Sequence, residues 1–345
     1  MDIRSSLWYV AEVALAIVIG LLVGAAIMQI GGYDPWAAYY SLFAMTLSSP
    51  YMVCSAISFM SPLVLTALTF AIGVRAGVFN IGAEGQVYIG ALGAVVVGAF
   101  SLPPYLYLPL EVALALSLAT LWGTIAGVLK AYRGVNEVVS TIMLNWIAYW
   151  IVEYMRVHVI FDPRDASKTI PVPPQGRLPL LVQGTELSAE LIIALVVDFV
   201  MLFLLWYTVL GYEIRAVGLN PQASKYGGIN VKRAVVYSFL LGGIASGLAG
   251  FGEVAGRPPS YAITTGLSNL FGLGFDGLAV SLIGANHPLG ILPAAFLMGI
   301  MKAGSRNMQI YARVPLEMVQ IVQGVIVVAL SVPGILRLIR RRLGR

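Results

Sequence analysis

Residues 189–210 read AELIIALVVDFVMLFLLWYTVL, and this stretch decides the class of fold. Apart from Glu190 at its beginning, its only charged residue is Asp198. A helix needs about 20 mostly apolar residues to cross the hydrocarbon core of a bilayer. The stretch is long enough and apolar enough, and it therefore predicts a membrane-spanning helix.

Nine further stretches have the same character. Hydrophobic residues make up 59% of the 345 residues and charged residues 11%, whereas a soluble domain carries roughly 25% charged residues. So few charges cannot form a polar shell around this much apolar surface, and lipid is the natural solvent. We predict an all-α fold, a polytopic transmembrane helical bundle of about ten spans. The expected spans are 8–30, 50–74, 82–100, 107–129, 138–160, 189–210, 234–252, 268–284, 288–304 and 317–336.

Three of these spans, 82–100, 268–284 and 288–304, are short or rich in glycine. We expect them to be tilted, broken or re-entrant, which a membrane protein tolerates where protein or a water-filled cavity surrounds them. The stretch 36–49 is predicted to be a short interfacial helix.

Basic residues predict the orientation. Ten spans put both termini on one side, and that side would hold 13 of the 21 Lys and Arg residues, including the tail Arg337–Arg345. The positive-inside rule then predicts cytoplasmic termini. Arg306 and Arg313, which this topology places on the other side, fit it worst, and they leave open whether 268–284 and 288–304 form a hairpin.

Two loops differ from the rest. Loop 161–188, predicted to be extracellular, has five prolines, which favour extended chain. Loop 211–233, predicted to be cytoplasmic, mixes charges and glycine. Within it, Pro221–Tyr226 is predicted to be a short helix with Asn220 as its cap. A short helix held between two spans is a plausible docking element for a partner.

Catalytic patterns are missing from the sequence. It contains no Walker A loop, no G-x-S-x-G elbow and no H-E-x-x-H. Without a phosphate-cradling loop, the chain cannot hydrolyse ATP by itself. Cys54 is the single cysteine, and His158 and His287 lack the spacing of metal ligands. We therefore expect no catalytic residue and no metal site, and the placement of basic residues favours membrane orientation over nucleic-acid binding.

Polar side chains inside the spans are the informative ones, because a charge at the bilayer centre costs ~2.5–3.5 kcal/mol. Such residues tend to face a cavity or a partner. The candidates are Glu84, Asn136, Glu137, Asn145, Glu153, Asp198, Glu253 and Asp276.

Three of these candidates have two interpretations each. Glu84 is either part of a polar wall or an acidic residue favoured by the dipole at a helix start. Asn145 needs a polar partner at its depth, in a substrate path or on a neighbouring helix. Asp276 follows Gly272 and Gly274, whose backbone either lines a pathway or allows close helix packing.

Four strings resemble the permease subunits of ABC importers in the branched-chain amino acid, ribose and nucleoside group. They are GVFNIGAEGQ at 77–86, NEVVSTIMLN at 136–145, GYEIRAVGLNP at 211–221 and GFDGLAVSLIG at 274–284. They occur in family order through most of the chain. The first most resembles the longer of the two permeases in bacterial guanosine and purine-nucleoside importers.

The resemblance implies a single transmembrane permease domain over 1–345 in the plasma membrane of a prokaryote. The implied partners are a cytosolic ATPase that binds ATP and Mg, a second permease and a Bmp-type extracellular binding lipoprotein, with no cofactor in this chain. The implied coupling residues are Glu213, Arg215, Gly218, Asn220, Pro221 and Ala223. The expected substrate pathway is lined by Asn80, Glu84, Gln86, Asn145 and Asp276. The family often has alanine where this chain has Ser224 and Lys225.

Other functions stay open at this point. A permease for simple sugars or branched-chain amino acids would share these strings. A stand-alone secondary transporter would need no docking loop such as 211–233. An intramembrane enzyme would need a catalytic constellation.

Overall fold

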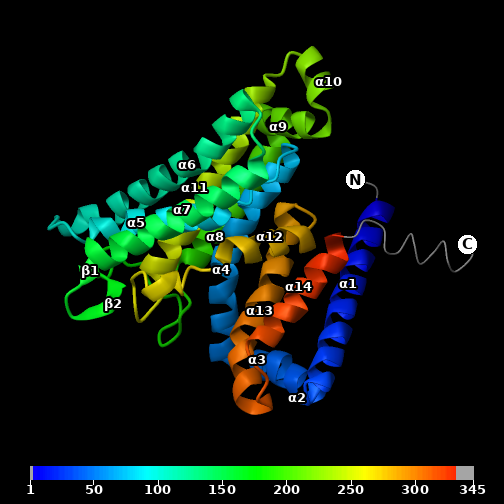
Figure 1. Ribbon diagram of the computed structural model, residues 1–345, viewed down its shortest axis with the longest axis vertical. Helices are drawn as coiled ribbons and strands as arrows, with labels where there is room; N and C mark the ends of the chain where they lie inside the picture. The colour runs from blue at the N-terminus through cyan, green and yellow to red at the C-terminus, as the bar shows by residue number, and fades with distance from the viewer. Residues whose placement is uncertain (1–2, 332–345) are drawn as a thin grey trace, which may run out of the picture.

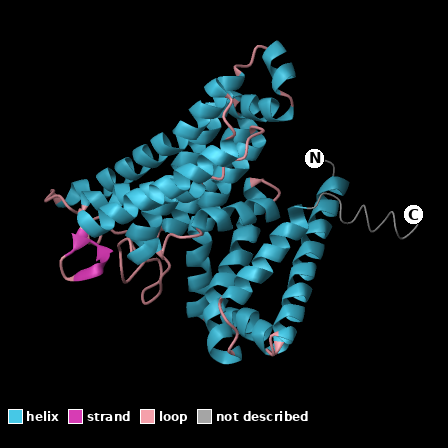
Figure 2. Ribbon diagram, viewed as in Figure 1, coloured by secondary structure: helices cyan, strands magenta, loops and turns pink. Residues whose placement is uncertain are grey.

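The computed structural model describes residues 3–331, and Figure 2 shows helices through most of this range. Fourteen α-helices follow one another. They are α1 (Ile3–Ile30), α2 (Pro35–Tyr39), α3 (Met45–Ser48), α4 (Pro50–Arg75), α5 (Ala83–Val97), α6 (Tyr107–Arg133), α7 (Glu137–His158), α8 (Glu190–Tyr207), α9 (Val209–Leu219), α10 (Pro221–Tyr226), α11 (Val231–Gly256), α12 (Leu273–Ile283), α13 (Pro288–Ala312) and α14 (Glu317–Ser331).

Seven of these helices are long and apolar enough to cross a membrane: α1, α4, α6, α7, α8, α11 and α13. Three shorter apolar helices accompany them, α5 with 15 residues, α12 with 11 and α14 with 15 described residues. The prediction of short segments at 82–100 and 268–284 is confirmed. The end of the segment 317–336 and the tail Arg337–Arg345 lie outside the described residues.

The prediction of a short or broken segment at 288–304 is wrong, because α13 is a continuous helix of 25 residues. Lys302 and Arg306 lie within this helix and not in a loop. The charge of Lys302 is balanced by an ion pair with Asp276 on α12, and a paired charge is much easier to bury than a single one.

Helices α4 and α11 form the centre of the bundle. In the apolar stretch of each helix, protein buries 78% of the residues in α4 and 72% in α11. The share is 28% in each of α6, α7 and α8. Close packing at the centre depends on glycine: a Cβ on Gly247 of α11 would lie 2.8 Å from the Cβ of Ala119 on α6, and one on Gly243 2.6 Å from the Cα of Thr120. Small residues of this kind let membrane helices approach closely.

Helix α1 lies at the edge of the bundle and packs mainly against α14 (Figure 1). Gly20 faces Ile326 and Gly24 faces Val322, so the two helices run antiparallel. The hydroxyl of Tyr39 donates a hydrogen bond of 2.6 Å to the carbonyl of Leu21 and fixes the end of α1 against the helical stretch 35–48.

Loops 211–233 and 161–188 lie at opposite ends of the bundle (Figure 1). The first contains α10, and the second contains the hairpin of β1 (Phe161–Asp162) and β2 (Asp165–Thr169). Loop 161–188 contains no helix. The predicted helix Pro221–Tyr226 is confirmed as α10. Its predicted cap is confirmed as well, since Oδ1 of Asn220 accepts hydrogen bonds of 3.0 Å from the backbone N–H groups of Gln222 and Ala223.

Candidate functional site

Glu84 joins the beginnings of two short helices. It lies in the first turn of α5, and its carboxylate accepts hydrogen bonds from the backbone N–H of Gly272 (2.5 Å) and of Gly274 (2.6 Å) at the start of α12. The hydroxyl of Tyr88 donates a third, of 2.5 Å. The side chain therefore holds the unpaired N–H groups that every helix start leaves free.

The side chain of Asn145 on α7 binds the backbone at the beginning of α5. Its Oδ1 accepts a hydrogen bond of 2.9 Å from the N–H of Gly85, and its Nδ2 donates one of 2.9 Å to the carbonyl of Ile81. Both groups belong to the segment in which the chain turns into α5. The partner that Asn145 requires at its depth is thus the backbone of a neighbouring segment.

Asn80 and Gln86 lie close together beside Gly82, and both are buried. Oδ1 of Asn80 accepts a hydrogen bond of 3.0 Å from the N–H of Gly82, whereas its Nδ2 has no partner. A Cβ on Gly82 would lie 3.0 Å from Oδ1 of Asn80 and 3.1 Å from Nε2 of Gln86, whose Oε1 also has no partner. The structure thus brings Asn80, Glu84, Gln86 and Asn145 together, and all four are buried by protein.

Asp276 has a different environment. Its Oδ2 forms an ion pair of 2.6 Å with Nζ of Lys302 on α13. Both residues line a groove of about 680 Å³ formed by α12, α13, α14 and Phe59 of α4. Of the five predicted pathway residues, Asp276 is the one on this groove.

The predicted coupling residues lie on α9 and α10. Asn220, Pro221 and Ala223 are exposed, while Glu213, Arg215 and Gly218 are partly buried against the bundle. Leu219 and Tyr226 add large exposed apolar side chains at the same end. A projecting short helix with exposed apolar side chains has the form of a docking element.

Arg215 on α9 contacts Trp206, which connects α9 to the bundle. Its guanidinium lies 5.7 Å from the ring centre of Trp206 at the end of α8, and that of Arg75 lies 5.4 Å from the same ring. Arg75 also donates hydrogen bonds to the carbonyls of Asn286 (3.0 Å) and Ala285 (3.2 Å) in the turn between α12 and α13. A continuous series of contacts therefore joins α9 to the helices that carry Asp276 and Lys302.

Gly218 allows the end of α9 to touch the end of α4. A Cβ at this position would overlap the carbonyl oxygen of Arg75. Opposite it, Gly77 has a φ of +75°, and a Cβ there would lie 3.1 Å from the Cα of Gly218. Glycine is required at 77 for its conformation and at 218 for the close approach.

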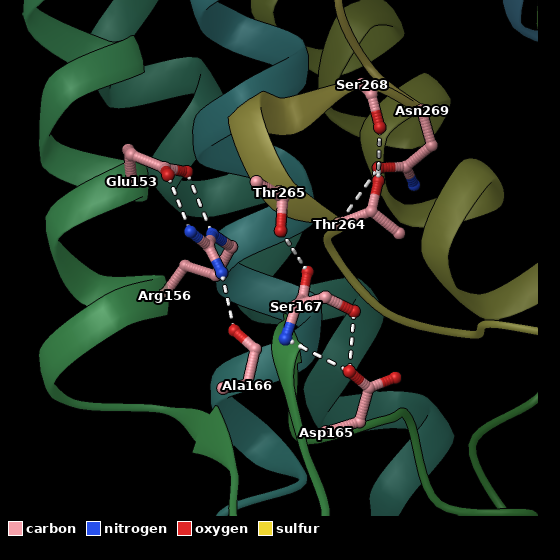
Figure 3. Close-up of polar contacts among 9 residues, drawn as sticks. All are labelled: Glu153, Arg156, Asp165, Ala166, Ser167, Thr264, Thr265, Ser268 and Asn269. Carbon is pink, nitrogen blue, oxygen red and sulfur yellow. Dashed lines mark hydrogen bonds and ion pairs between the residues drawn. The ribbon is translucent and has the colours of Figure 1, made fainter.

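At the opposite end, polar contacts fasten the β1–β2 hairpin to the bundle (Figure 3). Arg156 near the end of α7 pairs with Glu153 at 2.6 Å and donates a hydrogen bond of 3.1 Å to the carbonyl of Ala166. Thr265 donates one of 2.7 Å to the carbonyl of Ser167. The hydroxyl and the N–H of Ser167 in turn hold the pKa of Asp165 below its usual value, because both stabilise the ionised carboxylate.

Residues 52–331 match the protein family described as branched-chain amino acid transport system / permease component. The chain belongs to this family. It is therefore a transport component and a multi-pass membrane protein, in agreement with the seven long apolar helices. Among the described residues, no three His, Cys, Asp or Glu side chains form a group that could hold a metal ion.

Individual relatives agree with the family. The chain is 38% identical to the guanosine ABC transporter permease protein NupP of Bacillus subtilis, with 95% of each chain covered. It is 35% identical to the nucleoside ABC transporter permease protein NupB of Lactococcus lactis, covering 93% of this chain and 90% of that one. The glucose ABC transporter permease protein TsgB13 of Haloferax volcanii is 28% identical, covering 92% and 85%. No solved structure matches the chain.

The residues of these networks that the sequence does not single out include Arg75, Trp206 and Lys302. A signal existed for Lys302, since opposite charges in consecutive apolar segments indicate an ion pair. No such signal existed for Arg75 and Trp206, which are far apart in sequence and at helix ends, where basic and aromatic residues are ordinary.

Proposed function

We propose that this chain is the longer permease subunit of an ATP-driven importer that translocates nucleosides. The observation that carries the proposal is the similarity to the guanosine and nucleoside permeases, at 38% and 35% identity over nearly the full length of both chains. A sugar is the second candidate substrate, because the glucose permease is 28% identical over 92% of this chain.

Uptake by cells distinguishes the substrates. Cells without their own nucleoside uptake would produce this chain with its partner subunits and take up tritiated guanosine. Unlabelled inosine and uridine should compete, whereas ribose, glucose and leucine should not. Cells with an ATPase subunit that cannot hydrolyse ATP give the background. Competition by glucose or leucine alone would show that the nucleoside assignment is wrong.

We propose that all ten predicted segments enter or cross the membrane, with α5 and α12 as short helices enclosed by protein. The termini and the coupling segment 211–233 are then cytoplasmic and loop 161–188 is extracellular. The placement of α10 and the β1–β2 hairpin at opposite ends supports this arrangement. In a Cys54→Ser background, Asp165→Cys should react with an impermeant maleimide on intact cells, and Tyr226→Cys only after lysis. The reverse pattern would invert the topology.

The proposed partners are a cytosolic ATPase that holds ATP and Mg, a second permease and an extracellular binding lipoprotein. ATP binding closes the ATPase dimer and moves α10, and the contacts of Arg215, Trp206 and Arg75 carry the movement to the turn between α12 and α13. Replacing Arg215 or Asn220 by alanine should uncouple ATP hydrolysis from transport. Normal transport by both variants in reconstituted vesicles would refute the coupling assignment.

We propose that the substrate pathway passes Asp276 on the groove and reaches the buried side chains behind α12 when α12 moves away from α5. Those side chains are Asn80, Glu84, Gln86 and Asn145. The hydrogen bonds of Glu84 to Gly272 and Gly274 support the proposal, because they are the contacts that such a movement would break. Polar atoms without partners on Asn80 and Gln86 would then meet a hydroxyl-rich substrate.

A further inference from the structure

The groove beside Asp276 has the size and lining of a small-molecule site. Its volume is about 680 Å³, within the range of roughly 300–1,000 Å³ that is usual for such sites. Apolar side chains of α4, α12, α13 and α14 form most of the wall, and a few polar groups interrupt it. An apolar cleft with few polar groups binds and orients a ligand of mixed polarity.

The ion pair in this groove is not compatible with lipid. The Lys302 side chain is 24% exposed and that of Asp276 is 25% exposed. Lys302 lies in the interior of the long helix α13, and its charge is also within electrostatic reach of Glu253 on α11. Ionised side chains at such depth face water or protein partners. The open side of the pair therefore faces water or a partner protein and not lipid.

Unlike the ion pair, another polar group in the groove has an atom without a partner among residues 3–331. Gln323 of α14 lines the groove and is buried, and its amide nitrogen has no hydrogen-bond acceptor. Gln320, one helical turn earlier, lines the same groove. A buried donor without an acceptor is costly, so an acceptor atom of a ligand would satisfy this site.

Two phenylalanine rings complete the lining. Phe271 and Phe275, at the beginning of α12, are 54% and 46% exposed and both line the groove. Exposed aromatic rings beside hydrogen-bonding groups are the arrangement that proteins use to hold planar bases, by stacking on them.

We propose that this groove is the nucleoside-contacting site of the permease. The carboxylate of Asp276 accepts hydrogen bonds from the ribose hydroxyls. The ammonium of Lys302 and the amide of Gln323 donate to acceptor atoms of the base, and Phe271 and Phe275 stack on the ring. Neither Lys302 nor Gln323 is among the residues predicted from the sequence. This inference rests on the proposed function, since it names the residues that recognise the proposed substrate.

Transport by the complete transporter in proteoliposomes tests the site, with tritiated guanosine and saturating binding protein. Lys302→Met and Gln323→Leu should each lower the rate, Lys302→Met by about tenfold or more, the factor expected for one lost hydrogen bond to a charged group. Phe271→Leu should lower it as well. Gln29→Leu on α1 and Phe203→Leu on α8, both exposed and outside the groove, are the matched controls and should transport like the wild type.

The exchanged pair Asp276→Lys with Lys302→Asp separates recognition from structure. It keeps an ion pair, so it should keep the unfolding temperature of the wild type, while guanosine transport stays low. Recovery of transport by this double variant would overturn the proposal and leave the pair a structural role. So would wild-type rates in Gln323→Leu and Phe271→Leu. A wild type that does not transport guanosine would refute the proposed function itself, which is a different result.

Discussion

Oε2 of Glu84 accepts a hydrogen bond of 2.6 Å from the backbone N–H of Gly274, which lies 190 residues further along the chain. The other oxygen of the same carboxylate accepts one from Gly272. Through one side chain, the beginning of α5 and the beginning of α12 are held as a unit.

Replacing Glu84 by alanine should destabilise this unit. The N–H groups of Gly272 and Gly274 would lose their acceptor; Gly274 is buried and Gly272 partly buried, and a buried donor left unpaired costs ~1–3 kcal/mol. Thermal unfolding of the detergent-purified protein measures the loss. Glu137→Ala is the control, because its partly exposed pair with Lys130 is worth at most about 1 kcal/mol. Equal losses in both variants would contradict the role given to Glu84.

Replacing Asn145 by alanine should loosen the segment before α5. The N–H of Gly85 and the carbonyl of Ile81 lose their partner, at ~1–3 kcal/mol for each buried group. Hydrogen exchange followed by mass spectrometry should show faster exchange in residues 81–86. Asn136→Ala on the same helix removes an exposed cap and should leave 81–86 unchanged. Unaltered exchange at 81–86 in Asn145→Ala would argue against this contact.

Gly218→Ala should impair transport while the chain still folds. The added methyl group overlaps the carbonyl of Arg75, and relieving such an overlap typically costs ~1–3 kcal/mol and shifts the backbone. We expect reduced guanosine uptake with normal amounts of protein in the membrane. Gly227→Ala is the matched control, because its Cβ would make only ordinary contacts, at 3.4 Å and beyond. Similar uptake by the two variants would show that close approach at 218 is not needed.

Trp206→Ala should uncouple the transporter. The ring contacts the guanidinium groups of Arg75 and Arg215, and each cation–π contact is worth ~0.5–2 kcal/mol. ATP hydrolysis should continue while the guanosine transported per ATP falls, and Trp206→Phe should restore part of the ratio. Tyr207→Ala, an exposed neighbour on the same helix, should keep it. An unchanged ratio in Trp206→Ala would exclude this series of contacts.

The sequence alone predicts those features whose signal comes from residues that are neighbours in the chain. The length of the apolar stretches predicts the long helices. Asn220-Pro221 predicts α10 and its cap, because a cap and the helical turn that it begins are neighbours in the chain. The strings at 77–86 and 274–284 both carry the family resemblance, but nothing in them indicates that they contact each other. That contact joins a side chain to backbone N–H groups, which any residue type can supply.

The misplacement of Lys302 has a related cause. Its charge within 288–312 indicates the end of a span when α13 is considered alone. The pairing with Asp276 removes the cost of that charge, and the pairing exists only after α12 and α13 pack together. The groove, with Gln323 from α14, could not be predicted for the same reason.

The antiparallel packing of α1 against α14 has a consequence for how the protein is made. Among the described residues, α14 covers Gly20 through Ile326, and it covers Gly24 together with the hydroxyl of Tyr39. At about 5–20 residues per second, α1 waits on the order of tens of seconds in the bilayer before its partner is synthesised. A chain that stops before α14 leaves Gly20 without Ile326 against it, and this difference distinguishes an unfinished copy from a complete one.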